Sequence, residues 1–161
     1  MPTNVDNPIQ IVIRRIVLLN YLIDEALEKE LGTEMDFTVT QNTKFNISEE
    51  SAKFAITFSY IYKETREKPI EITVLTEFQL KDFAKVQDFE DKMNNNNLAR
   101  IPREVLITCL SLSLTHTRTL LSQNIASSIF MNKIPWPIFD PQVIADALYP
   151  GKDLYTLDKN K

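Results

Sequence analysis

The sequence predicts an α+β fold built on an antiparallel sheet. Three successive segments within 37–81 alternate apolar and polar residues with a period of two, as strands with one buried face do. Near the end of the chain, an amphipathic stretch follows good helix-capping residues. The 161 residues, 43% of them hydrophobic, fit a single domain with its core over about 9–149 and a polar tail over 150–161.

The first element is expected to be a strand over about 9–23. Its first residues alternate isoleucine with other side chains, and β-branched residues are dense. From Ile23 onward, apolar side chains recur every four residues, so the strand is expected to run into a helical turn. A single continuous helix over 9–31 is the alternative.

Three further strands are expected over about 37–47, 52–63 and 69–81. Their apolar side chains share one parity, and short charged segments connect them, as hairpin loops do. Each strand has about 10–12 residues, which is longer than usual. Such strands expose long edges that must be covered or paired with another chain. In the segment 81–100, the pattern permits only a short helix, followed by a turn or loop at the four asparagines Asn94–Asn97.

The segment after Pro102 fits both a strand and a helix. Leucines alternate with serine and threonine over 110–119, which predicts a strand. At helical spacing, a stripe of small residues lies beside an apolar stripe, and a partner helix could approach the small residues closely. The small stripe is Thr108, Ser111, Thr115, Thr119, Ser122 and Ala126, and the apolar stripe is Leu110, Leu114, Leu121 and Ile125.

A proline-rich segment follows over 133–141. Its prolines enforce an extended backbone around Trp136, Ile138 and Phe139. Asp140 is then a suitable N-cap for a short amphipathic helix, which the Pro150-Gly151 pair would end.

Composition excludes several classes of site. The net charge of −4 argues against a broad nucleic-acid surface, and two glycines are too few for a phosphate-cradling loop. The single cysteine and the lack of a signal-peptide pattern fit a reducing cytoplasm. Cys109 and His116 are too far apart for a nucleophile and its base, so we expect a buried thiol, a hydrogen-bonded histidine, no catalytic or metal site and no enzyme.

Apolar and aromatic side chains near the element ends are the candidate binding residues. They fit either a core with a covering lid or a surface that binds polypeptides by burying apolar area. The candidates are Tyr60, Tyr62, Ile134, Trp136, Ile138 and Phe139.

The order of these features resembles SecB and the wider SecB-like chaperone family. Arg15-Ile16-Val17 is similar to the Arg-Ile-Tyr of the family's first strand, and Glu77-Phe78-Gln79 ends the fourth strand. Thr117-Arg118 stands at the place of the family's Tyr-Ala-Arg in its long helix. The segment 134–141 is similar to the family's proline-rich segment, and the resemblance covers about residues 9–149.

The resemblance implies a four-stranded antiparallel β-meander packed by a long C-terminal helix over about 102–132 and a short final helix. It implies a holdase that binds unfolded polypeptide clients without ATP or any other cofactor. It also implies a homotetramer, a dimer of dimers joined through strand edges and long helices. The implied partners beyond unfolded clients are the SecA export motor or the antitoxin of a toxin–antitoxin system.

Three departures from the family bear on these partners. Gln79–Phe83 replaces the usual Gly-x-Phe, Thr115-His116 replaces Pro-Tyr, and the basic end Lys159–Lys161 replaces an acidic tail. They leave docking to SecA and service in a toxin–antitoxin system as equal alternatives. A carrier of a small apolar ligand, with one helix packed across a curved sheet, is the alternative from a different class.

Overall fold

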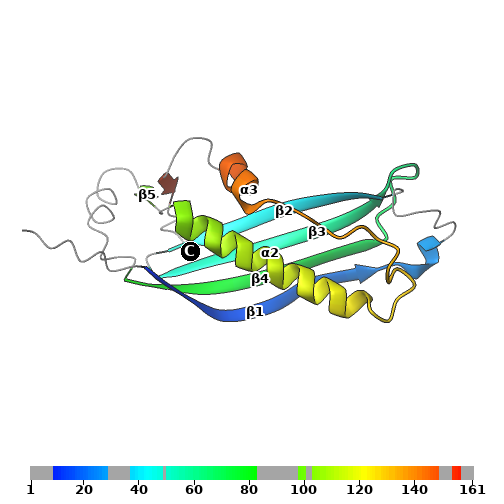
Figure 1. Cartoon of the computed structure of the whole chain (residues 1–161), viewed down its shortest axis with the longest axis horizontal. Helices are drawn as coiled ribbons and strands as arrows, with labels where there is room; N and C mark the ends of the chain where they lie inside the picture. The colour runs from blue at the N-terminus through cyan, green and yellow to red at the C-terminus, as the bar shows by residue number, and fades with distance from the viewer. Residues whose placement is uncertain are drawn as a thin grey trace, which may run out of the picture.

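The computed structural model describes residues 9–28, 37–48, 50–82, 98–100, 103–148 and 154–156. Within these ranges, a four-stranded antiparallel sheet carries a long and a short helix on one face (Figure 1). The strands of this sheet are β1 (Gln10–Ile23), β2 (Phe37–Ile47), β3 (Ser51–Tyr62) and β4 (Ile70–Lys81), and the helices are α2 (Arg103–Ile125) and α3 (Pro141–Leu148). A 3-10 turn, η1 (Glu25–Glu28), follows β1, and β5 (Leu98–Arg100) pairs with β6 (Leu154–Thr156).

The predicted α+β class is confirmed. β2, β3 and β4 form a meander through two short hairpins, and β1 joins the outer side of β4, which gives the order β1-β4-β3-β2. β1 and β2 are therefore the two edge strands. The strand predicted over 9–23 is present, and η1 is the helical turn expected after it, so the continuous-helix alternative is wrong.

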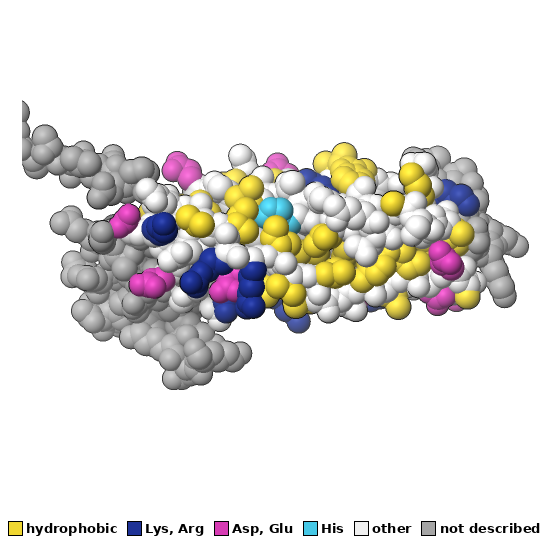
Figure 2. Space-filling model, turned by 90° about the horizontal axis from the view of Figure 1, so that it is seen from below, with side chains coloured by type: hydrophobic (Ala, Val, Ile, Leu, Met, Phe, Trp, Pro, Cys, Tyr) yellow, Lys and Arg dark blue, Asp and Glu magenta, His cyan; other side chains and the backbone are white. Residues whose placement is uncertain are grey.

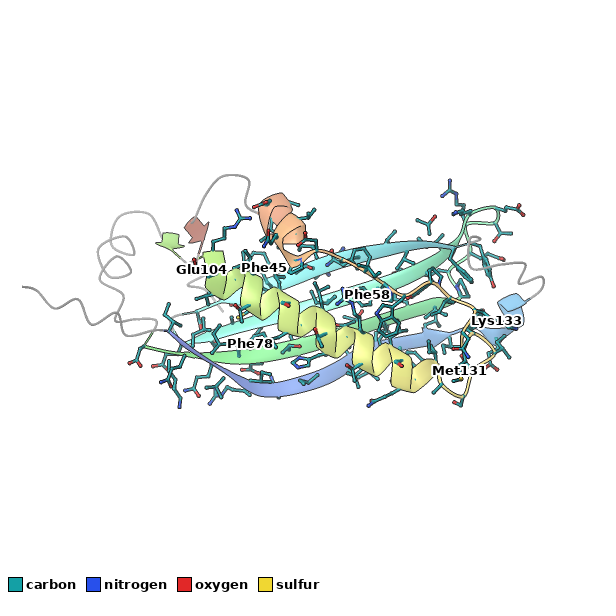
Figure 3. All side chains as sticks on the ribbon, in the orientation of Figure 1. Phe45, Phe58, Phe78, Glu104, Met131 and Lys133 are labelled. Carbon is teal, nitrogen blue, oxygen red and sulfur yellow. The ribbon has the colours of Figure 1, made fainter. Side chains whose placement is uncertain are left out.

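The two faces of the sheet differ as their alternation predicts. Even-numbered residues of β3 and β4 are buried under the helices, and they include Phe54, Phe58 and Phe78. Odd-numbered residues of the same strands lie on the face that no helix covers in the described part of the chain. Two aromatic pairs fill the covered side, with ring centroids 6.0 Å apart for Phe45–Phe54 and 6.1 Å apart for Phe54–Phe78 (Figure 3).

α2 lies obliquely across β3 and β4 and reaches β1 only marginally (Figure 1). The whole predicted apolar stripe of this helix is buried, and the described members of the small-residue stripe are exposed. The helix ends at Ile125, so the prediction that it continues to about 132 is wrong. Ser128 ends it: its backbone N–H and its hydroxyl both donate to the Ile125 carbonyl, each at 2.9 Å. The turns that follow bury Phe130 completely in the core.

β1 contains two irregularities that its sequence pattern hides. The pairing with β4 shifts between Ile13 and Arg15 and again between Leu18 and Asn20, which leaves one extra residue at each place. Each shift returns apolar side chains to the covered face after an interruption. The covered face of β1 therefore consists of Ile11, Ile13, Ile16, Leu18, Tyr21 and Ile23, each paired with a buried β4 residue.

Some expectations fall on parts of the chain outside the described residues. The short helix around 83–89 and the asparagine turn at 94–97 are among these. In the predicted polar tail, Leu154–Thr156 form β6, a pairing that the sequence did not indicate. None of the helices in the described ranges is both long and apolar enough to cross a membrane.

Candidate functional site

The proline-rich segment 134–140 runs from the turns after α2 back over the sheet toward α3 (Figure 1). Two side chains distant in sequence hold its backbone. The hydroxyl of Tyr60 donates to the carbonyl of Pro135 at 3.0 Å. The guanidinium of Arg118 donates through Nε to the carbonyl of Pro137 at 2.7 Å and through Nη2 to that of Phe139 at 3.2 Å.

The three anchored carbonyls belong to alternate residues, so this extended segment has an inner and an outer side. Pro137 is buried on the inner side. The side chains between the anchored residues are exposed, Trp136 by 52% and Ile138 by 82%. In extended backbone, side chains two residues apart lie on one side, roughly 6–7 Å apart. Trp136 and Ile138 together form a surface feature that we call the apolar ridge.

The six candidate residues are thus divided by the structure. Trp136 and Ile138 are at the surface. Tyr60 has no exposed surface, which corrects its expected place in a polypeptide-contacting surface. Its hydroxyl instead donates to the carbonyl of Pro135, and burial raises the pKa of this hydroxyl. Tyr62, Ile134 and Phe139 are partly buried against the core.

Aromatic stacking and a helix cap complete the support of the segment. Phe139 stacks on the buried Phe58, with ring centroids 5.4 Å apart and planes inclined by 25° (Figure 3). Four residues farther along β3, Tyr62 stacks on Phe37 of β2 with ring centroids 4.6 Å apart. Asp140 begins α3 as predicted, because its Oδ1 accepts from the N–H of Gln142 at 2.8 Å. The segment is fixed along its length by contacts with β3, α2 and α3.

A second exposed apolar surface lies along β1. Ile13, Ile16 and Leu18 face the helix side of the sheet but are 39–42% exposed, because α2 does not extend over them. We call these three residues the β1 stripe. Figure 2 shows hydrophobic side chains gathered along this side of the molecule, around the single histidine. Sequence reasoning missed the stripe, since the two register shifts of β1 conceal which residues share a face.

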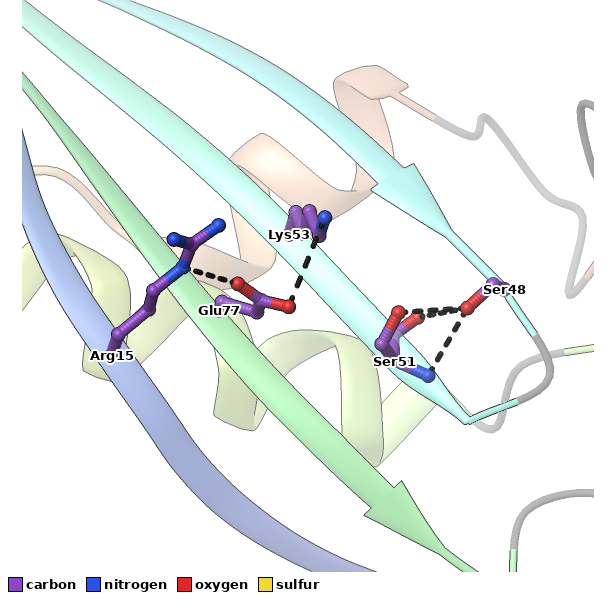
Figure 4. Close-up of polar contacts among 5 residues, drawn as sticks. All are labelled: Arg15, Ser48, Ser51, Lys53 and Glu77. Atoms are coloured by element: carbon purple, nitrogen blue, oxygen red, sulfur yellow. Dashed lines mark hydrogen bonds and ion pairs between the residues drawn. The ribbon is translucent and has the colours of Figure 1, made fainter. Parts of the chain in front are cut away.

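The opposite, uncovered face of the sheet carries polar cross-strand pairs. Glu77 accepts from Arg15 at 2.5 Å and lies 3.8 Å from the ammonium of Lys53 (Figure 4). At the start of the β2–β3 hairpin, the hydroxyls of Ser48 and Ser51 lie 2.7 Å apart (Figure 4). Hydrogen bonding from Arg15 lowers the pKa of Glu77. This carboxylate is therefore an ionised partner in a pair rather than a proton donor.

Glu71 lies in a similar network on the same face of β4, six residues before Glu77. It accepts from Lys68 at 2.5 Å, from Ser59 at 2.9 Å and from Asn20 at 3.1 Å. These hydrogen bonds, the one from Lys68 foremost, lower the pKa of Glu71. Both carboxylates on this face of the sheet therefore have cationic partners.

Cys109 and His116 have the surroundings predicted for them. Burial raises the pKa of the Cys109 thiol to about 12, so the thiolate is suppressed at neutral pH. Nδ1 of His116 lies 3.3 Å from the hydroxyl of Thr76, and partial burial lowers the pKa of this imidazole. In the described part of the chain, no three His, Cys, Asp or Glu side chains come together in a way that could hold a metal ion.

Comparison of the sequence with models of known protein families and with curated proteins finds no match.

Proposed function

We propose that this protein is an ATP-independent holdase that binds non-native polypeptides through the apolar ridge. The observation that carries the proposal is the exposure of Trp136 and Ile138 on a segment held by Tyr60, Arg118 and Phe58. Trp136 and Ile138 lie on the same side of one fixed segment, where a binding surface for unfolded chains gains apolar contact area. Such a surface binds by area and does not require a particular client sequence.

The resemblance to SecB-like chaperones is the second support. It rests on the short motifs of the sequence and on the order of the long strands, the long helix and the proline-rich segment. It suggests cytoplasmic clients, with export by SecA and toxin–antitoxin control as the two settings in which such a holdase would act.

We further propose that the protein assembles as a homotetramer, a dimer of dimers joined through β1 edges and α2 helices. β1 pairs only with β4 in the described part of the chain, and the β1 stripe beside its free edge is apolar. On the exposed side of α2, the hydroxyls of Thr115 and Thr119 donate to carbonyls four residues earlier and leave a surface of small side chains. Both surfaces are suited to a second copy of the chain.

The test of holdase function is suppression of client aggregation. A reduced, unfolded client is diluted into buffer without nucleotide, and light scattering is recorded with and without the protein. We expect wild-type protein to suppress scattering and the double variant Trp136→Ala/Ile138→Ala to suppress it much less, because the exposed apolar area is removed. Val143→Ala is the matched control, since Val143 is 64% exposed but lies on α3, outside both the apolar ridge and the β1 edge. Equal suppression by the double variant and the wild type would overturn the proposal.

A further inference from the structure

We propose that Arg118 is the positioning residue of the apolar ridge: its guanidinium holds two alternate carbonyls of the segment 134–140 and thereby keeps Trp136 and Ile138 outward as a preformed contact surface. The inference rests on the proposed function, because it assigns a cause to the arrangement of the surface that would bind clients. Arg118 touches the ridge backbone and is not itself part of the exposed surface.

Arg118 is chemically exceptional on its helix. It is the only charged residue between Glu104 and the end of α2 at Ile125. A half-buried guanidinium needs hydrogen-bond acceptors, and the carbonyls of Pro137 and Phe139 provide two. Charged donors make stronger hydrogen bonds than neutral ones. The single cation of this helix region is thus used to bind backbone 19 and 21 residues farther along the chain.

The two-carbonyl contact requires an arginine. A guanidinium is planar and presents several N–H groups in a fixed geometry, so Nε and Nη2 can each bind a different acceptor. The ammonium of a lysine is a compact point donor on a flexible stem and would not fix both carbonyls in one orientation. Tyr60 fixes the Pro135 carbonyl from the sheet, so that Arg118 and Tyr60 together hold alternate carbonyls from two elements.

Fixing the ridge before a client arrives would increase affinity without adding contacts. Each residue that is ordered on binding loses backbone entropy, and a preformed segment avoids that loss. The loss of order at Trp136 and Ile138 alone would therefore weaken client binding by about tenfold or more.

The experiment uses Trp136 as its own reporter, because it is the only tryptophan of the chain. Acrylamide quenching and steady-state anisotropy of tryptophan fluorescence are measured on the full-length protein, alongside the dissociation constant for an unfolded client. In Arg118→Ala we expect stronger quenching, lower anisotropy and client affinity reduced about tenfold. Arg118→Lys keeps the positive charge, but we expect its quenching and anisotropy to remain close to those of Arg118→Ala. Tyr60→Phe should change the fluorescence in the same direction, because it removes only the bond to Pro135.

Two controls separate positioning from general destabilisation. Arg103→Ala removes an arginine from the same helix, one that pairs with Asp146 of α3 at 2.7 Å, and should leave the Trp136 signals unchanged. Leu114→Ala should lower the melting temperature without altering native-state quenching. Unchanged Trp136 fluorescence in both Arg118→Lys and Tyr60→Phe would overturn the inference, even if Arg118→Ala failed to fold. A fluorescence change with no client binding by the wild type would instead overturn the proposed function and leave the role of Arg118 intact.

Discussion

His116 makes the stability of the fold dependent on pH in a defined window. Partial burial lowers its pKa in the folded state below the unfolded value of about 6.5, and Thr76 is its hydrogen-bond partner. The unfolded chain therefore binds a proton first as the pH falls, and the folded state loses stability relative to it. Above about pH 7.5 both states are neutral at this position, so the effect vanishes there.

We expect the free energy of unfolding to be lower at about pH 5.5 than at about pH 7.5, and the difference to shrink in His116→Asn. The pKa values of Glu71 and Glu77 are lowered in the folded state, so protonation of these carboxylates destabilises the fold only in more acidic solution. The interval from about pH 7.5 to about pH 5.5 therefore reports mainly on His116. Urea denaturation at the two pH values measures the difference. An identical difference in the variant would show that another group is responsible.

Single residues show what sequence chemistry can and cannot anticipate. The environments of Cys109 and His116 were predicted, because a lone thiol and a lone histidine without partners are most often structural. The division between Trp136, which is exposed, and Tyr60, which is buried, was not. The burial of Tyr60 follows from its even parity on β3, whereas the exposure of Trp136 depends on contacts of the segment 134–140 with residues distant in sequence, which local pattern does not encode.

At the scale of elements, α2 illustrates how a sequence can fit two structures. Its leucines satisfy both the period of a strand and that of a helix, and only packing on the sheet decides between them. β2, β3 and β4 were predictable because each keeps one parity throughout. For β1, the sequence predicted a strand but not which residues face the helices, because each of its two register shifts changes the parity of the covered face.

Adjacent buried positions on α2 are expected to respond very differently to substitution. Leu114 is 1% exposed, and Leu114→Ala should cost about 2–5 kcal/mol through lost burial and the cavity left behind. Ser113 is also buried, but its hydroxyl donates at 2.7 Å to the Cys109 carbonyl, which the helix backbone already uses. Ser113→Ala should therefore change the free energy of unfolding by less than about 1 kcal/mol. Denaturant unfolding of both variants tests the pair, and a large cost for Ser113→Ala would contradict this account.

At the scale of the whole molecule, the apolar ridge and the β1 stripe lie on the same face of the sheet, on opposite flanks of α2, and have different support (Figure 1). The apolar ridge lies on the segment 134–140, whose backbone carbonyls accept hydrogen bonds from Tyr60 of β3 and Arg118 of α2. The β1 stripe belongs to an edge strand with a free side within the described residues. This difference fits the two proposed roles, in which the β1 stripe contacts other copies of the chain and the apolar ridge binds clients.

If the β1 stripe is the subunit contact, substitutions there should dissociate the assembly without unfolding the chain. Ile16→Glu/Leu18→Glu would place two carboxylates on the β1 stripe, where 42% and 39% exposure lets them reach water in a single chain but not in an interface. We expect light scattering coupled to size-exclusion chromatography to give the mass of one chain for this variant and a larger mass for the wild type. Far-UV circular dichroism should remain that of the folded sheet and helices.

The matched control is Thr40→Glu/Asn42→Glu, which adds the same charges at two exposed positions of the other edge strand, β2. It should keep the mass of the wild type, because the proposed dimer contact involves β1 and not β2. If the β1 variant kept the full assembly, or if the wild type itself eluted as one chain, the β1 stripe would not be a subunit interface.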